Sequence, residues 1–181
     1  MTAAVGQLGP LGVFLLMLPE SACIPVPSEA TLLAAGFAAR QGWMPFWAAV
    51  AAATAGNLVG SLIAYGIGRL SASRGGPGRV QAGLGRCDAI FARHGARAVF
   101  IARLMPLART FVSLPAGHAR VEILRFIAMT TAGCAIWATA FALLGMLVGS
   151  GSAAVGGPIG DGLALAALLA LAVVWRRIPS P

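Results

Sequence analysis

The chain has 181 residues, of which 59% are hydrophobic and only 10% are charged, and its mean hydropathy is +0.86. A soluble domain is about 25% charged, so this composition excludes a water-facing surface and predicts a polytopic α-helical membrane protein. The net charge of +8 comes from arginines that cluster in short loops beside apolar runs. Such clusters are typical of cytoplasmic loops in membrane proteins, and they argue against nucleic-acid binding.

The first 42 residues predict a helix followed by a broken hairpin. Residues 8–18 are apolar, although a full span needs about 20 residues. Residues 19–42 are also mostly apolar, but they contain Pro19, Pro25 and Pro27. Three prolines this close exclude a straight helix, and broken backbone survives at membrane depth only inside protein or beside a cavity. We therefore expect a re-entrant hairpin, with the uncharged N-terminal stretch retained in the mature fold because it lacks the basic start of a signal peptide.

The next segments predict a span and a polar loop. Residues 43–68 form an apolar run with Trp43 and Trp47 at one end as interfacial aromatics. Residues 69–97 are rich in arginine and contain apolar residues at helical spacing, namely Val80, Leu84, Cys87 and Phe91. This pattern predicts an amphipathic helix on the cytoplasmic surface.

The second half of the chain repeats this order. Residues 98–118 are apolar and interrupted at Pro106, which predicts a second re-entrant hairpin. Residues 121–148 predict a span, residues 149–158 an uncharged turn, and residues 159–175 a last span followed by a basic tail.

The arginines predict the orientation of these segments. The 69–97 loop and the Arg176-Arg177 tail should be cytoplasmic, and the 149–158 turn external. Both termini are then cytoplasmic, and the two hairpins enter from opposite sides. Arg40 is the one basic residue on the external side of this scheme.

Short echoes relate the two halves. Thr54-Ala55-Gly56 matches Thr131-Ala132-Gly133, and Ala35-Gly36 matches Ala116-Gly117. We predict one all-α membrane domain over residues 1–181, an inverted repeat of two broken-helix hairpins with about three to four spanning helices. Inverted repeats with broken helices are typical of transporters whose site lies at the midplane.

Four ionisable residues fall at membrane depth: Glu20, Glu29, Arg103 and Arg109. A charge at the bilayer centre costs about 2.5–3.5 kcal/mol, so chance placement is disfavoured. One interpretation is that acids and arginines pair and fasten the hairpins together. The other is a polar cavity for a charged substrate or for protons, since arginine grips phosphate with two hydrogen bonds and a carboxyl group removed from water holds its proton more tightly. A break in the helix at Pro106, between the two arginines, would bring both to one site.

Asn57 lies in the middle of a predicted span and must find a hydrogen-bond partner there. The candidates are Ser28, Thr31, Ser61 and Tyr65. The two histidines have no second ligand at metal-binding spacing, so neither a metal site nor a cofactor is predicted.

Several spaced signatures occur in order across residues 15–149. The first comprises Glu20, Ile24-Pro25-Val26-Pro27-Ser28-Glu29 and Ala35-Gly36. The second comprises Gly56-Asn57 and Tyr65-Gly66-Ile67-Gly68-Arg69. The third comprises Phe91-Ala92-Arg93-His94-Gly95, Phe100, Arg103-Leu104-Met105-Pro106, Arg109 and Ala116-Gly117, with Phe126 and Trp137 in the span that follows. Together they resemble the DedA family, with residues 150–181 forming a C-terminal helix and basic tail beyond the family-like core.

This resemblance implies opposed re-entrant hairpins and the movement of lipids across the bilayer, with undecaprenyl phosphate or another phospholipid as substrate and membrane lipids as partners. The family's essential acids map onto Glu20 and Glu29, and its essential arginines onto Arg103 and Arg109. Supporting positions are Asn57, Pro25, Pro27, Pro106, Gly36, Gly117 and Tyr65. The family usually has an acid where this chain has Asn57, which weakens the expectation of proton coupling.

The sequence therefore predicts a lipid-phosphate translocase, flippase- or scramblase-like, in the bacterial inner membrane. Arg103 and Arg109 would bind the phosphate, while Glu20 and Glu29 would gate, pair with the arginines or take protons. Two alternatives stay open: a proton-coupled small-solute transporter or ion pathway, and a structural membrane assembly factor. An enzyme such as a lipid phosphatase is not expected, because no nucleophile–base arrangement is evident.

Overall fold

The computed structural model describes residues 2–22, 28–74, 87–106 and 108–148, and within these ranges the chain consists of helices joined by turns. The helices are α1 (Thr2–Ser21), α2 (Ser28–Arg40), α3 (Phe46–Arg74), α5 (Arg97–Arg103), α6 (Ala108–Phe111), α7 (Ser113–His118) and α8 (Ile123–Val148). Residues 87–94 are also helical. Two helices are long and apolar enough to cross a membrane, Phe46–Ser73 and Ile123–Leu147. The predicted all-helical architecture with apolar spans is therefore confirmed for the described residues.

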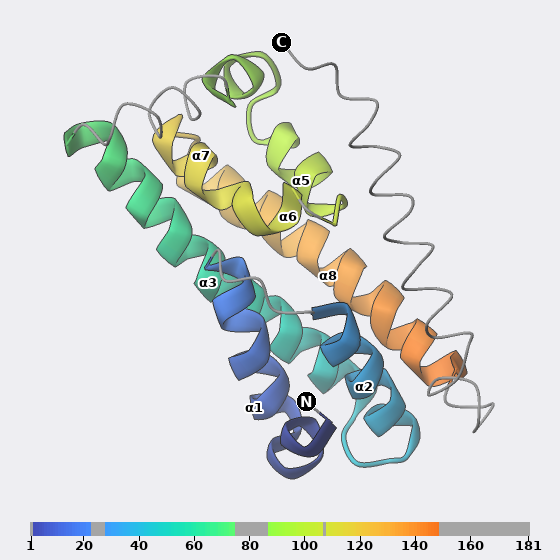
Figure 1. Cartoon of the computed structure of the whole chain (residues 1–181). Helices are drawn as coiled ribbons and strands as arrows, with labels where there is room; N and C mark the ends of the chain where they lie inside the picture. The colour runs from blue at the N-terminus through green and yellow to red at the C-terminus, as the bar shows by residue number, and fades with distance from the viewer. Residues whose placement is uncertain (1, 23–27, 75–86, 107, 149–181) are drawn as a thin grey trace, which may run out of the picture.

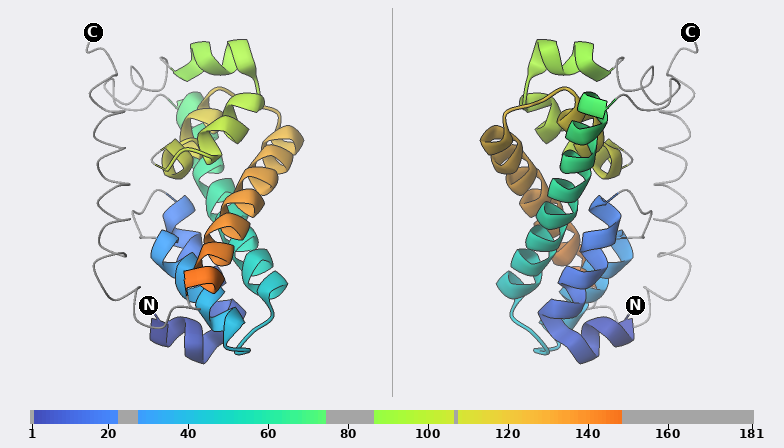
Figure 2. Two further views of the ribbon diagram at one scale, coloured as in Figure 1. Left: turned by 90° about the vertical axis from the view of Figure 1, so that its right-hand side faces the viewer. Right: turned by 90° about the vertical axis from the view of Figure 1, so that its left-hand side faces the viewer.

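The two long helices cross each other and carry a hairpin at each end (Figures 1 and 2). The α1–α2 hairpin lies at the end marked by the N-terminus, and α5, α6 and α7 lie at the opposite end. The inner ends of both hairpins meet about halfway along α3 and α8. Side chains from the two hairpins therefore come together in the middle of the molecule.

Each hairpin packs on both long helices. In the first hairpin, α1 packs mainly on α3 and α2 on α8, while in the second, α5 packs on α8 and α7 on α3. The hairpins thus tie the two long helices together at both ends.

Glycines make this packing close. A Cβ atom at Gly36 of α2 would lie 2.0 Å from the Ala142 carbonyl oxygen of α8, and one at Gly117 of α7 would lie 2.0 Å from the Tyr65 carbonyl oxygen of α3. Two glycines of the long helices behave in the same way toward the hairpins, Gly68 against Leu114 and Gly145 against Leu33. Small residues are how helices approach one another in lipid, where association depends on van der Waals packing.

The boundaries of α1 and α3 differ from the prediction. We expected the first helix to end before Pro19, but α1 continues through Pro19 to Ser21 and is kinked instead at Gly9, whose φ is 54°. A proline removes one backbone hydrogen bond, and here only two helical residues follow it, so the loss stays local. The span predicted at residues 43–68 is α3, which begins at Phe46, after Gly42 with φ 77° and Pro45, and runs on to Arg74.

The predicted break in the second hairpin is observed at residues 104–106, between α5 and α6, with Pro106 exposed in the bend. Within the polar loop, Phe91 is buried and Arg93 is exposed on the 87–94 helix, as an amphipathic helix requires. Several predictions lie outside the described residues: Pro25 and Pro27, Val80 and Leu84, the 149–158 turn and the 159–175 span.

Candidate functional site

Three of the four predicted charges meet where the inner ends of the hairpins face each other. Glu20 lies near the end of α1, Arg103 at the end of α5 and Arg109 in α6. Their exposed fractions are 4%, 2% and 4%, so all three are removed from solvent. The bend around Pro106 lets Arg103 and Arg109 face one region although they are six positions apart in the chain.

Arg109 is paired with Glu20 through a single nitrogen. Its Nη2 donates to both Glu20 carboxylate oxygens, at 2.7 Å and 2.8 Å, and also to Ser28 Oγ at 3.1 Å. Ser28 in turn donates to Glu20 Oε1 at 2.7 Å. The other terminal nitrogen, Nη1, is buried and has no hydrogen-bond partner among the described residues. The guanidinium therefore uses only half of its donor fork.

Arg103 has a different role, because its contacts fix neighbouring backbone and hydroxyl groups. Its Nη1 donates to the Arg109 carbonyl oxygen at 2.6 Å, and its Nη2 donates to Ser61 Oγ and Ser113 Oγ, each at 2.6 Å. These bonds join α3, α5, α6 and α7. Arg103 thereby positions the segment that carries Arg109.

Trp137 of α8 covers Arg109. The guanidinium carbon lies 4.9 Å from the centre of the indole ring, a cation–π contact. Phe141, one turn further along α8, stacks on Trp137 with ring centres 4.7 Å apart. The sequence assigned no role to Trp137, although its spacing of three residues from Cys134 and seven from Thr130 was a sign of an inward-facing stripe.

Glu29 and Asn57 lie near this cluster but are not bound to the arginines. Glu29 is half-buried and accepts a long bond of 3.3 Å from Ser28 Oγ, and it makes no ion pair within the described ranges. Asn57 Oδ1 accepts from Ser21 Oγ at 2.7 Å. Ser21 was not among the partners predicted for Asn57, so that prediction is wrong: Ser61 instead bonds the Asn57 backbone carbonyl.

Tyr65 lies farther along α3 and serves the second hairpin. Its hydroxyl donates to the Val121 carbonyl oxygen and accepts from Arg69 Nη1 at 3.0 Å. It therefore anchors the turn that links α7 to α8 and does not contact the buried charges.

The charges of the central cluster are unbalanced. Two arginines, Arg103 and Arg109, lie beside one buried carboxyl group, Glu20, in a place that solvent does not reach. Arginine forks suit carboxylates and phosphates, so the arrangement favours an added anion. Within the described ranges no group of three or more metal-ligating side chains occurs.

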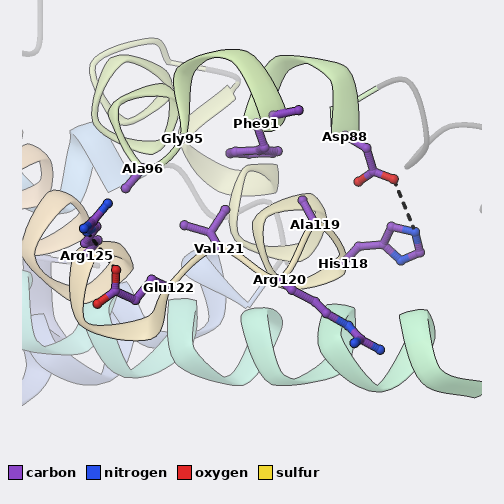
Figure 3. Close-up of a pocket in the computed structure, with 11 residues that line it drawn as sticks. Asp88, Phe91, Gly95, Ala96, His118, Ala119, Arg120, Val121, Glu122 and Arg125 are labelled. Carbon is purple, nitrogen blue, oxygen red and sulfur yellow. Dashed lines mark ion pairs between the residues drawn. The ribbon is translucent and has the colours of Figure 1, made fainter.

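An open hollow of about 520 Å³ lies apart from this cluster, where the 87–94 helix meets the end of α7 (Figure 3). Phe91 and Val121 form its apolar wall, and Asp88 Oδ2 lies 3.9 Å from His118 Nε2 at one edge. It shares no lining residue with the arginine cluster, so the hollow and the buried charges are separate features.

The VTT domain family matches residues 26–147 of the chain. An "Alkaline phosphatase-like protein" of Lactococcus lactis subsp. lactis (strain IL1403) is 31% identical over 156 residues, which are 80% of this chain and 73% of that protein. "Undecaprenyl phosphate transporter A" of Bacillus subtilis (strain 168) is 31% identical over 134 residues, 69% of this chain and 66% of that protein. The protein of the same name from Staphylococcus aureus (strain NCTC 8325 / PS 47) is 29% identical over 154 residues, 80% of this chain and 76% of that protein. No solved structure matches the chain significantly.

Proposed function

Because the chain belongs to the VTT domain family, we propose that it carries a lipid phosphate across a membrane as a flippase- or scramblase-like translocase. Relatives named undecaprenyl phosphate transporter A support undecaprenyl phosphate, a phosphate monoester, as the substrate, with a phospholipid as the alternative. The proposed location is the bacterial inner membrane, with several spans and both termini in the cytoplasm.

The observation that carries this proposal is the buried Arg109 guanidinium, whose anionic partner is the Glu20 carboxylate. An arginine enclosed in this way needs a negative charge beside it. Glu20 supplies that charge in the present state, and a lipid phosphate would supply it during transport. Phosphate suits arginine because both can form parallel hydrogen bonds.

This competition suggests how transport and protons are coupled. When a phosphate binds Arg109, Glu20 loses its counter-charge and binds a proton more readily. Ser28, which bonds both Glu20 and Arg109, would then hold the neutral carboxyl group. Glu29 is the second carboxylate within reach of Ser28, whereas Asn57 carries no titratable proton.

We further propose that the two halves are inverted repeats and that both hairpins are re-entrant. Matched close contacts support this idea. They are Gly36 on Ala142 with Gly117 on Tyr65, Gly145 on Leu33 with Gly68 on Leu114, and Gly56 on Phe14 with Gly133 on Arg103. Movement of either hairpin against the long helices would expose the buried cluster to one side of the membrane at a time.

The test is leaflet exchange of labelled undecaprenyl phosphate in liposomes that contain the purified protein. We expect the wild type to accelerate exchange and Arg109→Lys to lower the rate at least about tenfold, because lysine lacks the planar fork. Arg125→Lys is the matched control, since Arg125 is an exposed arginine paired with Glu122 at 2.7 Å. Exchange by the wild type no faster than in empty liposomes, with and without a proton gradient, would refute the translocase.

The same liposomes decide between the translocase and the other functions. Phosphate release from the lipid would indicate an enzyme, a class that the name of the Lactococcus relative raises. Proton-driven uptake of small solutes without lipid exchange would favour a solute or ion pathway. Absence of all three activities would leave a structural assembly role.

A further inference from the structure

Two buried N–H donors lack partners on side chains that touch each other. They are Arg109 Nη1 and Trp137 Nε1, each almost without solvent contact and without a hydrogen-bond partner in the described part of the chain. Buried donors are nearly always paired in folded proteins, and leaving one unpaired is costly. A pair of such donors in one place therefore indicates an absent acceptor.

The contacts of Arg109 define which donors are free. Its Nη2 is already saturated by Glu20 and Ser28, so Nη1 is the nitrogen still able to donate. Its guanidinium lies over the Trp137 ring, with 4.9 Å between the guanidinium carbon and the ring centre. Phe141, also on α8, packs against the indole ring and holds it in place. The unpaired indole N–H therefore lies on the edge of the same ring whose face contacts the Arg109 guanidinium.

The surrounding face of α8 is also turned toward the charges. Thr130 Oγ1 is a third buried polar atom without a described hydrogen-bond partner, and it lies seven residues before Trp137 on the same helical face. Gly133, on the adjoining turn, lets α8 approach Arg103, because a Cβ there would lie 2.6 Å from the Arg103 Cβ. The site thus has a wall on α8 in addition to the two hairpins.

We propose that Arg109 Nη1 and Trp137 Nε1 form a two-donor subsite for a phosphate monoester, which makes Trp137 a substrate-binding residue. The inference rests on the proposed function and deepens it. A phosphate monoester presents three terminal oxygens on a tetrahedron, so one oxygen can accept from the guanidinium while another accepts from the indole. A carboxylate has only two oxygens, so one that binds the guanidinium as Glu20 does, with both oxygens on a single nitrogen, has none left for the indole. The subsite therefore selects phosphate amphiphiles over carboxylate amphiphiles.

The test measures binding and does not depend on transport. Purified protein in a non-ionic detergent is titrated with dodecyl phosphate and, separately, with laurate, which has a chain of the same length. Trp137→Phe keeps the aromatic ring over Arg109 but removes the N–H donor. We expect it to raise the Kd for dodecyl phosphate about tenfold or more, as the loss of a hydrogen bond to a charged acceptor does, and to leave the Kd for laurate within about twofold. Trp47→Phe is the matched control, because Trp47 is 72% exposed, and neither affinity should change.

Each result decides the matter. An equal loss of affinity for both amphiphiles would give Trp137 a structural role only, and unchanged affinity for dodecyl phosphate would remove it from the site; both outcomes overturn the subsite. The same follows if the wild type binds neither amphiphile. Should Trp137→Phe fail to fold, a protein with Trp137 as its single tryptophan replaces it: dodecyl phosphate must change its fluorescence emission, and laurate must not.

The binding and transport results separate the two proposals. Lipid exchange by the wild type with dodecyl phosphate affinity unaltered in Trp137→Phe would retain the translocase and refute the subsite. Phosphate-selective binding that depends on Trp137, without any lipid exchange, would retain the subsite and refute the translocase. Inorganic phosphate added as a competitor distinguishes the source of the anion: displacement of dodecyl phosphate at equal concentration would support the subsite but assign it to free phosphate.

Discussion

Gly117→Ala is the change that tests the packing of the second hairpin most directly. A Cβ at this position would lie 2.0 Å from the Tyr65 carbonyl oxygen, whereas real Cβ atoms essentially never approach within 3.0 Å. Since the Tyr65 atoms in contact belong to the backbone, no side chain can turn aside, and α7 must move away from α3 by at least 1.0 Å, the difference between these distances. A gap of about 0.5–1 Å already removes a quarter to a half of a van der Waals contact.

We expect Gly117→Ala to lower the free energy of unfolding by about 1–3 kcal/mol, the usual cost of overpacking. The measurement is thermal or denaturant unfolding in detergent, followed by helical circular dichroism. Gly66→Ala is the matched control, because it lies in α3 with no atom within 4 Å of its added Cβ. Alanine there gains helix propensity worth about 1 kcal/mol, so this variant should be at least as stable as the wild type. Equal unfolding of the two variants would contradict the close approach of α7 to α3.

Three further predictions concern the buried pair, the hairpin anchor and the polar loop. Glu20→Gln removes the negative charge beside Arg109, and removing one partner of a buried ion pair costs about 3–5 kcal/mol. We expect a lower melting temperature, which dodecyl phosphate raises more in the variant than in the wild type. An equal rise in both proteins would contradict the competition between Glu20 and phosphate. Tyr65→Phe leaves the Val121 carbonyl without its donor, so unfolding should become easier by about 1–3 kcal/mol, while lipid exchange below the melting temperature should persist; a loss of exchange in folded protein would place Tyr65 in the site. Burial, with a smaller contribution from the neighbouring aspartate, raises the pKa of the Cys87 thiol. The test uses protein whose other cysteines are replaced by serine and a membrane-impermeant maleimide. Because less thiolate is present at neutral pH, the maleimide should label Cys87 more slowly than free cysteine, at a rate that increases with pH, and only from the cytoplasmic side. Labelling from outside would reverse the predicted orientation.

The sequence predicted the long helices and the bend in the second hairpin because both depend on local physics. Residues 43–68 and 121–148 are apolar over the length that a bilayer requires, and Pro106 cannot continue a helix without losing a hydrogen bond. Glu20 and Arg109 were both predicted at membrane depth, and the structure brings them together. Their pairing follows because the end of α1 lies against α6.

The partners of the buried polar groups could not be predicted, since they depend on how distant segments pack. The error for Asn57 follows from the error in the first helix: α1 continues past Pro19, and this places Ser21 against α3. Arg103 likewise finds Ser61, which is 42 residues away in the chain. Trp137 reads as an ordinary membrane tryptophan until α6 is placed over it.

The exchange of contacts between hairpins and long helices has a consequence for biosynthesis. Gly36 lies against Ala142, which the ribosome adds 106 residues later. At about 5–20 residues per second, α2 waits roughly 5–20 s for the helix on which it packs, while Glu20 waits nearly as long for Arg109. During that interval the first hairpin has charge and polar backbone but lacks its final neighbours, so it must be sheltered by the insertion machinery or stay at the membrane surface. Assembly of this protein therefore waits until α8 has been made and both hairpins can pack on it.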